Sequence, residues 1–311
     1  MNKYYLILNP TAQSGRGKKL WPEIFSLLDR EKLAYEIGTS TYAGHSVVLA
    51  QEAALTGKYQ GIVAIGGDGT INEVLNGLRQ ACQLLNSTQT LPAFGIIYTG
   101  TSPDICKYHK IPLKMTEAVA NLKRHRVVMI DVGEVIYKKN STDQTSWFLC
   151  SVNLGIGASV ADGSNSGLRR YFGDLLGTFF SIILSVLKYK QANLKVRFDG
   201  QEMLFEKTLN MAIGKNPLIA SGVKVDVEVL PDDGKMYLFS INNMGLLSLL
   251  FNVKKIYDGS LHRLPSNKLI FINSFACDYS SAAPDVEFDG DPQGKLPCSI
   301  KLLPKKIGLI K

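Results

Sequence analysis

The chain has 311 residues, and its 35 Lys and Arg against 27 Asp and Glu give a formal net charge of +8 at pH 7. A hydrophobic content of 45% with 20% charged residues is typical of a folded globular protein and excludes a disordered, collagen-like or coiled-coil chain. The length predicts two domains, and the excess of positive charge favours an anionic partner.

The five cysteines stand singly along the chain without a Cys-x-x-Cys pair, which predicts reduced thiols in a cytoplasmic protein. Residues 1–15 lack the apolar core and cleavage site of a signal peptide. The most apolar later stretch, residues 175–187, is shorter than the roughly 20 residues that a membrane span needs. We therefore expect a buried helix there, with a surface-lying helix as the alternative.

In the first part of the chain, apolar runs alternate with helical patterns. Strands are predicted at 4–8, 61–65 and 94–97, and helices at 18–33, 45–55, 71–84 and 113–122. Strands that alternate with helices of about 10 to 15 residues form parallel sheets covered by helices. Residues 1–125 are therefore predicted to form an α/β domain with a mainly parallel sheet.

After residue 125 the pattern changes to strands, with one predicted helix at 169–190. Strands are predicted at 127–137, 146–153, 194–199, 202–213, 235–240 and 268–273. Turn signals such as Asp199-Gly200 and Asp233-Gly234 separate them. Many strands divided by tight turns predict a β-rich, sandwich-like second domain over residues 126–311.

Three glycine-rich turns follow predicted strands of the first domain, at residues 9–17, 66–73 and 98–104. In an open α/β sheet ligands bind at the carboxyl ends of the strands, where backbone N–H groups near a helix start suit phosphate oxygens. The second turn, Gly66-Gly67-Asp68-Gly69-Thr70, is the most specific, because adjacent glycines admit a ligand close to the backbone beside a carboxylate and a hydroxyl. Ordinary turns and helix caps are the alternative explanation for each.

These motifs resemble the diacylglycerol kinase catalytic-domain family, specifically its bacterial soluble lipid kinases, whose fold is akin to that of NAD kinases and phosphofructokinases. The resemblance runs through Asn9-Pro10, Gly44-His45, residues 66–77 (GGDGTINEVLNG), 95–104, 153–157, 230–234 and 289–291. It implies ATP contacts at Asn9, Thr11, Ser40, Gly67, Asp68, Gly69, Thr70 and Thr101. We expect ATP to lie between the two domains.

The resemblance also implies a structural Mg²⁺ in the second domain, held by the Leu230 carbonyl, the Asp233 carboxylate and the Lys235 carbonyl. An acidic turn before a strand is the alternative explanation. Hard cations prefer such oxygen ligands.

Near the C-terminus, Asp289-Gly290-Asp291 matches the family's Asp-Gly-Glu motif. It implies a catalytic centre with Asp291 as the base and Asp289 orienting metal or substrate, although the two roles could be exchanged. The resemblance also implies that Asp68 is a catalytic residue, as the carboxylate at the ATP phosphates. Residues from about 286 to 311 are expected to contribute to the catalytic cleft or to return to the first domain.

The sequence departs from the family pattern at Pro103, where the family has Asn, and at Asp291, where it has Glu. The implied function is an ATP- and Mg²⁺-dependent lipid kinase that phosphorylates a lipid hydroxyl, with diacylglycerol as a candidate acceptor. The alternatives are an NAD kinase-like enzyme and a catalytically weak, nucleotide-regulated lipid-binding protein.

With a net charge of +8, we expect the protein to bind the inner face of an anionic membrane peripherally and reversibly. We expect no nucleic-acid partner. The sequence is compatible with a homo-oligomer.

Overall fold

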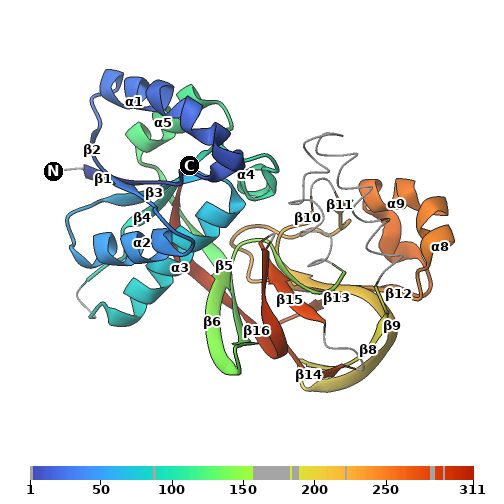
Figure 1. Ribbon diagram of the computed structural model, residues 1–311. Coiled ribbons are helices and arrows are strands. Elements are labelled where there is room, and N and C mark those ends of the chain that lie inside the picture. Colours follow the sequence, from blue (N-terminus) through green and yellow to red (C-terminus); the bar gives the residue numbers. More distant parts are fainter. Residues whose placement is uncertain are drawn as a thin grey trace. The chain divides into compact units, whose positions relative to one another are not determined.

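The computed structural model describes residues 3–86, 89–156, 183, 189–220, 223–280, 284–289 and 291–311. The chain divides into two compact units (Figure 1). The first unit is Met1–Val132 with Pro304–Lys311, and the second unit is Gly133–Leu303. The helix predicted at 169–190 lies outside the described residues, apart from residues 183, 189 and 190.

Parallel strands form the sheet of the first unit. They are β1 (Lys3–Leu8), β2 (Ala34–Thr39), β3 (Gly61–Gly66) and β4 (Ala93–Tyr98). Strand β1 pairs with β2 and β3, and β3 pairs with β4. The end of β16 (Asp291–Ile310) joins β4 in parallel at Leu309. All side chains of β3 and β4 are buried, as expected for strands covered on both faces.

Helices lie on both faces of this sheet. They are η1 (Ala12–Leu20), α1 (Trp21–Arg30), α2 (His45–Leu55), α3 (Asp68–Leu84), α4 (Asp104–His109) and α5 (Met115–Arg124). Figure 1 shows α1 and α5 on one face and α2 and α3 on the other. Tyr4, Leu6 and Leu8 alternate along β1 and share one buried core with side chains of α1 and α5. On the opposite face, a Cβ at Gly77 would lie 2.5 Å from the Ala50 Cβ, so this glycine permits the close contact of α2 and α3.

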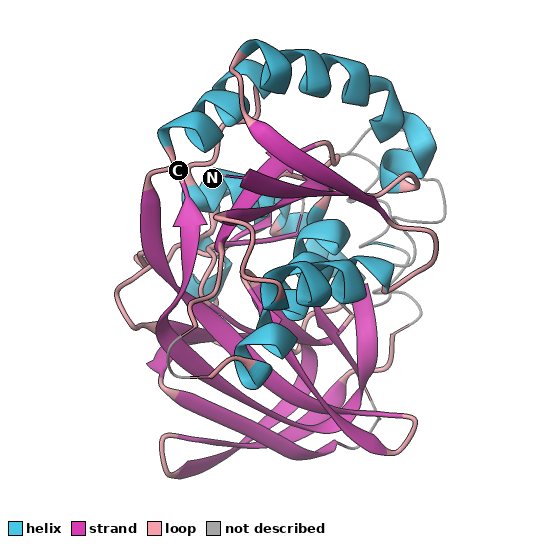
Figure 2. Ribbon diagram, turned by 90° about the vertical axis from the view of Figure 1, so that its left-hand side faces the viewer, coloured by secondary structure: helices cyan, strands magenta, loops and turns pink. Residues whose placement is uncertain are grey.

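The second unit consists mainly of antiparallel strands, drawn in magenta in Figure 2. Its strands are the latter part of β5 (Val127–Lys139), β6 (Thr142–Phe148), β7 (Ser151–Gly155), β8 (Ala192–Phe198), β9 (Gln201–Gly214), β10 (Leu218–Ala220), β11 (Val223–Lys224), β12 (Met236–Asn242), β13 (Lys268–Ile272), β14 (Ser274–Ser280), β15 (Asp285–Phe288) and the first part of β16. Three short helices, α8 (Leu246–Phe251), α9 (Val253–Asp258) and η3 (Ser260–Arg263), follow β12.

The strand pairing of the second unit closes into a ring. Strand β9 pairs with β7 and β8, β7 pairs with β15, β15 with β16, β16 with β14, and β14 with β8. Strands β12 and β13 extend the sheet from β9. Inward-facing residues of the ring, among them Val152, Val196, Ile213 and Phe288, form one buried core.

The division into an α/β part and a β-rich part is confirmed. Two local predictions were wrong: the helix predicted at 18–33 is the end of η1 followed by α1, and the strand predicted at 146–153 is the end of β6, a break at Leu149 and Cys150, and the start of β7. All five cysteines are free thiols. Within the described part of the chain, no helix is long and apolar enough to cross a membrane.

Candidate functional site

Three turns of the first unit meet at the carboxyl ends of β1, β3 and β4. The Asn9 side chain, just after β1, donates a hydrogen bond of 3.0 Å to the Thr70 hydroxyl in the turn after β3. The same Asn9 side chain accepts hydrogen bonds from the backbone N–H and the hydroxyl of Thr11. The backbone N–H of Thr99, after β4, donates to the Gly66 carbonyl at 2.8 Å. The structure thus brings Asn9, Thr11 and Thr70 into one hydrogen-bonded group.

Two glycines of these turns lie against each other. A Cβ on Gly100 would stand 2.7 Å from the Gly67 Cα and 2.5 Å from the Tyr98 hydroxyl oxygen. Any larger residue at position 100 would therefore push the two turns apart. Gly67 directly precedes α3, whose first backbone N–H groups have no partner within the helix and suit an anion. The glycines thus let the second and third turns approach each other closely at the N-terminus of α3.

Two carboxylates, Asp68 and Asp104, begin the helices that follow the second and third turns. Burial raises the pKa of the Tyr98 hydroxyl far above its ordinary value, and the Asp68 and Asp104 carboxylates raise it further. Burial followed by the Asp68 carboxylate also raises the pKa of the Cys106 thiol. Asp68 therefore acts on both buried groups, and Asp104 acts on Tyr98. Mg²⁺ is commonly held by one or two carboxylates together with substrate phosphates, which is the type of side chain that Asp68 and Asp104 supply at the starts of α3 and α4.

The remaining nucleotide contacts implied by the resemblance lie around this group. Ser40 is buried after β2, and its backbone N–H donates to the Leu8 carbonyl at 2.9 Å. Gly69 lies in the first turn of α3, and Thr101 is exposed in the turn after β4. Their roles at ATP stay predictions.

Thr99 is a candidate that the sequence analysis did not single out. Its side chain is 2% exposed, and its hydroxyl has no hydrogen-bond partner among the described residues. It lies 3.4 Å from where a Cβ on Gly17 would stand, between the first and third turns. Its position immediately after a buried strand was the available signal.

In the second unit, Asp289 is tied to backbone. One carboxylate oxygen accepts the Leu149 N–H at 3.1 Å and the other accepts the Cys150 N–H at 2.9 Å. Asp289 is buried and adopts a positive φ of 49°. The backbone of Asp291 pairs with Phe288 at the start of β16, whereas its side chain lies outside the described residues. The Asp289 carboxylate therefore has a positioning role, because it holds the backbone of Leu149 and Cys150 between β6 and β7.

Glu287 is a second buried carboxylate that the sequence analysis missed. It accepts a hydrogen bond of 2.6 Å from the Asn153 amide, and Asn153 in turn accepts one of 3.1 Å from Asn210. These residues lie on the adjacent strands β15, β7 and β9. The contact between Asn153 and Glu287 spans 134 residues and depends on the pairing of β15 with β7, so no local pattern in the sequence indicated it.

Comparison with known proteins gives the family. A model described as the diacylglycerol kinase catalytic domain matches residues 3–135, and one described as the YegS C-terminal NAD kinase beta sandwich-like domain matches residues 150–311. The chain belongs to the diacylglycerol kinase catalytic-domain family. The resemblance inferred from the motifs is thereby confirmed.

Known proteins match along almost the whole chain. A protein of Staphylococcus haemolyticus named diacylglycerol kinase is 26% identical over 309 residues, which cover 97% of this chain and 86% of the relative. A solved structure of a diacylglycerol kinase from Bacillus anthracis has a TM-score of 0.69 at 20% identity, covering 99% of this chain and 96% of that chain. Yeast NADH kinase, solved with NADH, has a TM-score of 0.52 at 13% identity, covering 99% and 82%. The two structures show a shared fold.

The Mg²⁺ that the family resemblance implies in the second unit does not fit the residues present. The Lys215 ammonium donates to the Asp233 carboxylate at 2.5 Å and to the Lys235 carbonyl at 3.1 Å, so it takes two of the three expected ligands. Burial alone would raise the pKa of the Asp233 carboxyl, but Lys215 and the N–H groups of Leu230 and Lys235 hold it below its ordinary value. No catalytic step is assigned to a metal there.

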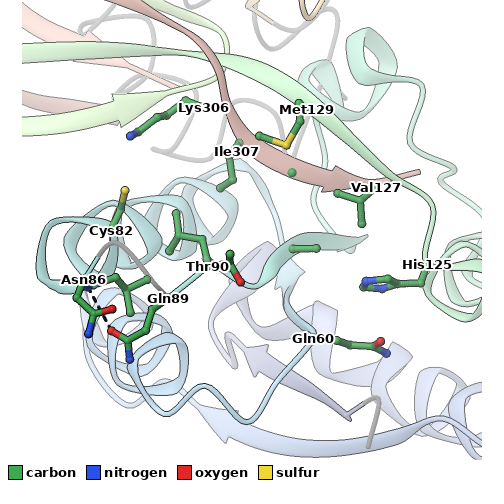
Figure 3. Close-up of a pocket in the computed structure, with 14 residues that line it drawn as sticks. Gln60, Cys82, Asn86, Gln89, Thr90, His125, Val127, Met129, Lys306 and Ile307 are labelled. Atoms are coloured by element: carbon green, nitrogen blue, oxygen red, sulfur yellow. Dashed lines mark hydrogen bonds between the residues drawn. The ribbon is translucent and has the colours of Figure 1, made fainter.

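A pocket of about 620 Å³ lies elsewhere in the first unit (Figure 3). Its lining includes Gln60, directly before β3, and Ala93, the first residue of β4. It is therefore at the amino ends of these strands, whereas the three turns follow their carboxyl ends. Figure 3 shows His125, Val127 and Met129 along it. The pocket is separate from the candidate nucleotide site.

Proposed function

We propose that this protein is an ATP- and Mg²⁺-dependent kinase that transfers the γ-phosphoryl group to a lipid hydroxyl, with diacylglycerol as the first acceptor to test. The observation that carries the proposal is the meeting of three turns at the carboxyl ends of β1, β3 and β4. There, Gly67 and Gly100 let the turns that lead into Asp68 and Asp104 approach each other closely. Phosphoryl transfer depends mainly on positioning and charge stabilisation, which such a group of turns supplies.

The reaction needs a group that accepts the proton of the lipid hydroxyl. In the proposed step the hydroxyl oxygen forms a bond to the γ-phosphorus, the bond to the β,γ-bridging oxygen breaks, and ADP leaves. Asp291 takes the proton as general base. Asp289 is the less suitable base, because each of its oxygens already accepts a backbone N–H.

The departures from the family pattern in the third turn are compatible with this function. Pro103 precedes the first residue of α4, a position where a missing backbone N–H removes no intrahelical bond. Ile105, which follows the motif, is fully buried. Asp104, the carboxylate of the motif, keeps its place at the start of α4.

A lipid acceptor requires contact with a membrane, and α8 offers a suitable surface. Leu247 and Phe251 are 71% and 87% exposed, and Leu250 is 45% exposed. Lys254 and Lys255 follow in α9, directly after these apolar side chains. Apolar side chains flanked by lysines favour the interface of an anionic membrane, and the net charge of +8 acts in the same direction.

The test is a transfer assay with γ-labelled ATP and three acceptors: diacylglycerol in anionic vesicles, other lipid hydroxyls in the same vesicles, and NAD. We expect label in a lipid, and loss of that label in Asp291→Asn. Label in NAD alone would show the NAD kinase-like alternative. Binding of ATP and vesicles without turnover would instead show a nucleotide-regulated lipid-binding protein.

A further inference from the structure

We propose that the Lys215 ammonium takes the place of a divalent cation at the loop 230–235. The side chain of Lys215 holds this loop at the end of β9, and the backbone of Lys215 binds the segment that positions Asp289. The proposal concerns the second unit alone and does not depend on the identity of the phosphoryl acceptor. It starts from the ligands that a metal would need.

Those ligands are already used by hydrogen-bond donors of the chain. Asp233 Oδ1 accepts from Lys215 Nζ at 2.5 Å and from the Lys235 N–H at 3.0 Å, while Oδ2 accepts from the Leu230 N–H at 2.8 Å. The Lys235 carbonyl also accepts from Lys215. Mg²⁺ needs near-octahedral oxygen ligands at about 2.0 to 2.1 Å. At these oxygens it would stand directly beside a positive ammonium, which repels it.

Burial makes the ammonium an integral part of the loop. Lys215 is 4% exposed, and the Asp233 side chain is 15% exposed. Removing one partner of a buried ion pair leaves an uncompensated charge, which is strongly destabilising. If Lys215 lost its charge, the Asp233 carboxylate and the Lys235 carbonyl would keep their places and be open to another cation.

The backbone of Lys215 connects this loop to the candidate catalytic motif. At the end of β9, a Cβ on Gly214 would lie 2.5 Å from the Cys150 carbonyl oxygen, so the glycine permits a close approach. The Lys215 N–H donates to that carbonyl at 3.0 Å. The Cys150 N–H in turn donates to Asp289 at 2.9 Å. Lys215 is thus a positioning residue: its side chain holds the loop and its backbone holds the segment that binds Asp289.

The experiment measures thermal unfolding of the full chain without nucleotide, in EDTA and in millimolar Mg²⁺. Wild type should unfold at the same temperature in both. Lys215→Met should unfold at a lower temperature in EDTA and recover by roughly 5 to 10 °C when Mg²⁺ stands at about 100 times its Kd. Lys224→Met, which changes an exposed lysine of the same unit, is the matched control and should behave like wild type.

A second variant and a direct binding measurement decide the origin of any recovery. Adding Asp233→Asn to Lys215→Met should abolish the recovery, because the proposed site then lacks its carboxylate. Mn²⁺ titrated into nucleotide-free protein and followed by electron paramagnetic resonance should bind Lys215→Met but not wild type.

Three results would overturn the proposal. One is Asp233-dependent Mn²⁺ binding by wild type, which can be measured even if Lys215→Met does not fold. Another is a wild-type unfolding temperature that rises with Mg²⁺ and loses this rise in Asp233→Asn. The third is a destabilised Lys215→Met that neither recovers with Mg²⁺ nor binds Mn²⁺, because the ammonium would then be an ordinary ion-pair partner.

Discussion

Replacing Asp289 by Asn should destabilise the second unit even though the side chain keeps its size. Asp289 adopts a φ of 49°, and Asn tolerates this left-handed conformation, so the backbone does not have to change. The substitution instead changes the acceptors. An Asn side chain has one carbonyl oxygen, and its amide group must face either the Leu149 or the Cys150 N–H.

The magnitude follows from these two hydrogen bonds. One charge-assisted bond is lost, the other is weakened to a neutral one, and a buried backbone donor is left without an acceptor. Together these changes should cost about 2 to 4 kcal/mol. For a unit of this size the melting temperature should fall by roughly 4 to 16 °C.

The assay is urea unfolding of the full chain followed by circular dichroism, with the slope m compared between variants. Asp285→Asn is the matched control on β15, the strand that leads to Asp289, because Asp285 forms an exposed ion pair with Lys295 that should contribute less than about 1 kcal/mol. A free energy of unfolding of Asp289→Asn within about 0.5 kcal/mol of wild type would refute the positioning role of this carboxylate.

The other predictions concern the site directly. Asp68→Ala should weaken Mg²⁺-ATP binding at least about tenfold by isothermal titration, a loss of about 1.4 kcal/mol; unchanged affinity in a folded variant would contradict the role of the second turn. Gly100→Ala should separate the two apposed turns, cost about 1 to 3 kcal/mol in urea unfolding and weaken ATP binding; a variant with wild-type affinity would show that the contact with the second turn is dispensable. Asp291→Asn should lower the rate of single-turnover lipid phosphorylation about 10²- to 10⁴-fold with ATP affinity intact, whereas Asp291→Glu should retain activity. Full activity in Asp291→Asn would show that Asp291 is not the general base. Phe251→Ser should reduce sedimentation with anionic vesicles, and Leu84→Ser, at an exposed leucine of the first unit, should not; equal losses would argue against α8 as the contact.

Local signals in the sequence were sufficient to predict where the three turns lie and that they come together. Each turn combines glycine with hydroxyl or carboxylate side chains immediately after a run of buried apolar residues, as at β3 and β4. Because the carboxyl ends of neighbouring parallel strands share one edge of a sheet, their proximity could be predicted without knowing any contact. The bond between Asn9 and Thr70, 61 residues apart, is an example of that proximity.

Strand β2 was missed because its residues carry little pattern. Among the strands that the structure describes it is paired only with β1, and most of its side chains are exposed, including Ile37 at 46%. An edge strand of this kind has neither the continuous apolar run of a buried strand nor regular alternation. Its existence depends on hydrogen bonds to β1, which are a tertiary feature.

The break between β6 and β7 has a similar origin. Residues 142–155 are compatible with one continuous strand, but the N–H groups of Leu149 and Cys150 leave the ladder and bind Asp289, 140 and 139 residues away. A buried N–H must find an acceptor, and here the acceptor comes from the far end of the chain. No local reading of residues 146–153 could have revealed it.

At the loop 230–235, the oxygen ligands of a cation could be predicted from the sequence, but the identity of the cation that they bind could not. Backbone carbonyls around an acidic side chain suit a hard cation, and that part of the pattern is local. Whether a metal is needed depends on the charge balance of the buried site, which includes side chains from other strands. Here the balancing charge is Lys215, which follows β9 and is 18 residues from Asp233. A buried ammonium with two of the expected ligands supplies the positive charge itself, so a metal ligand set carried over from relatives has to be tested against every cation that the fold brings to it.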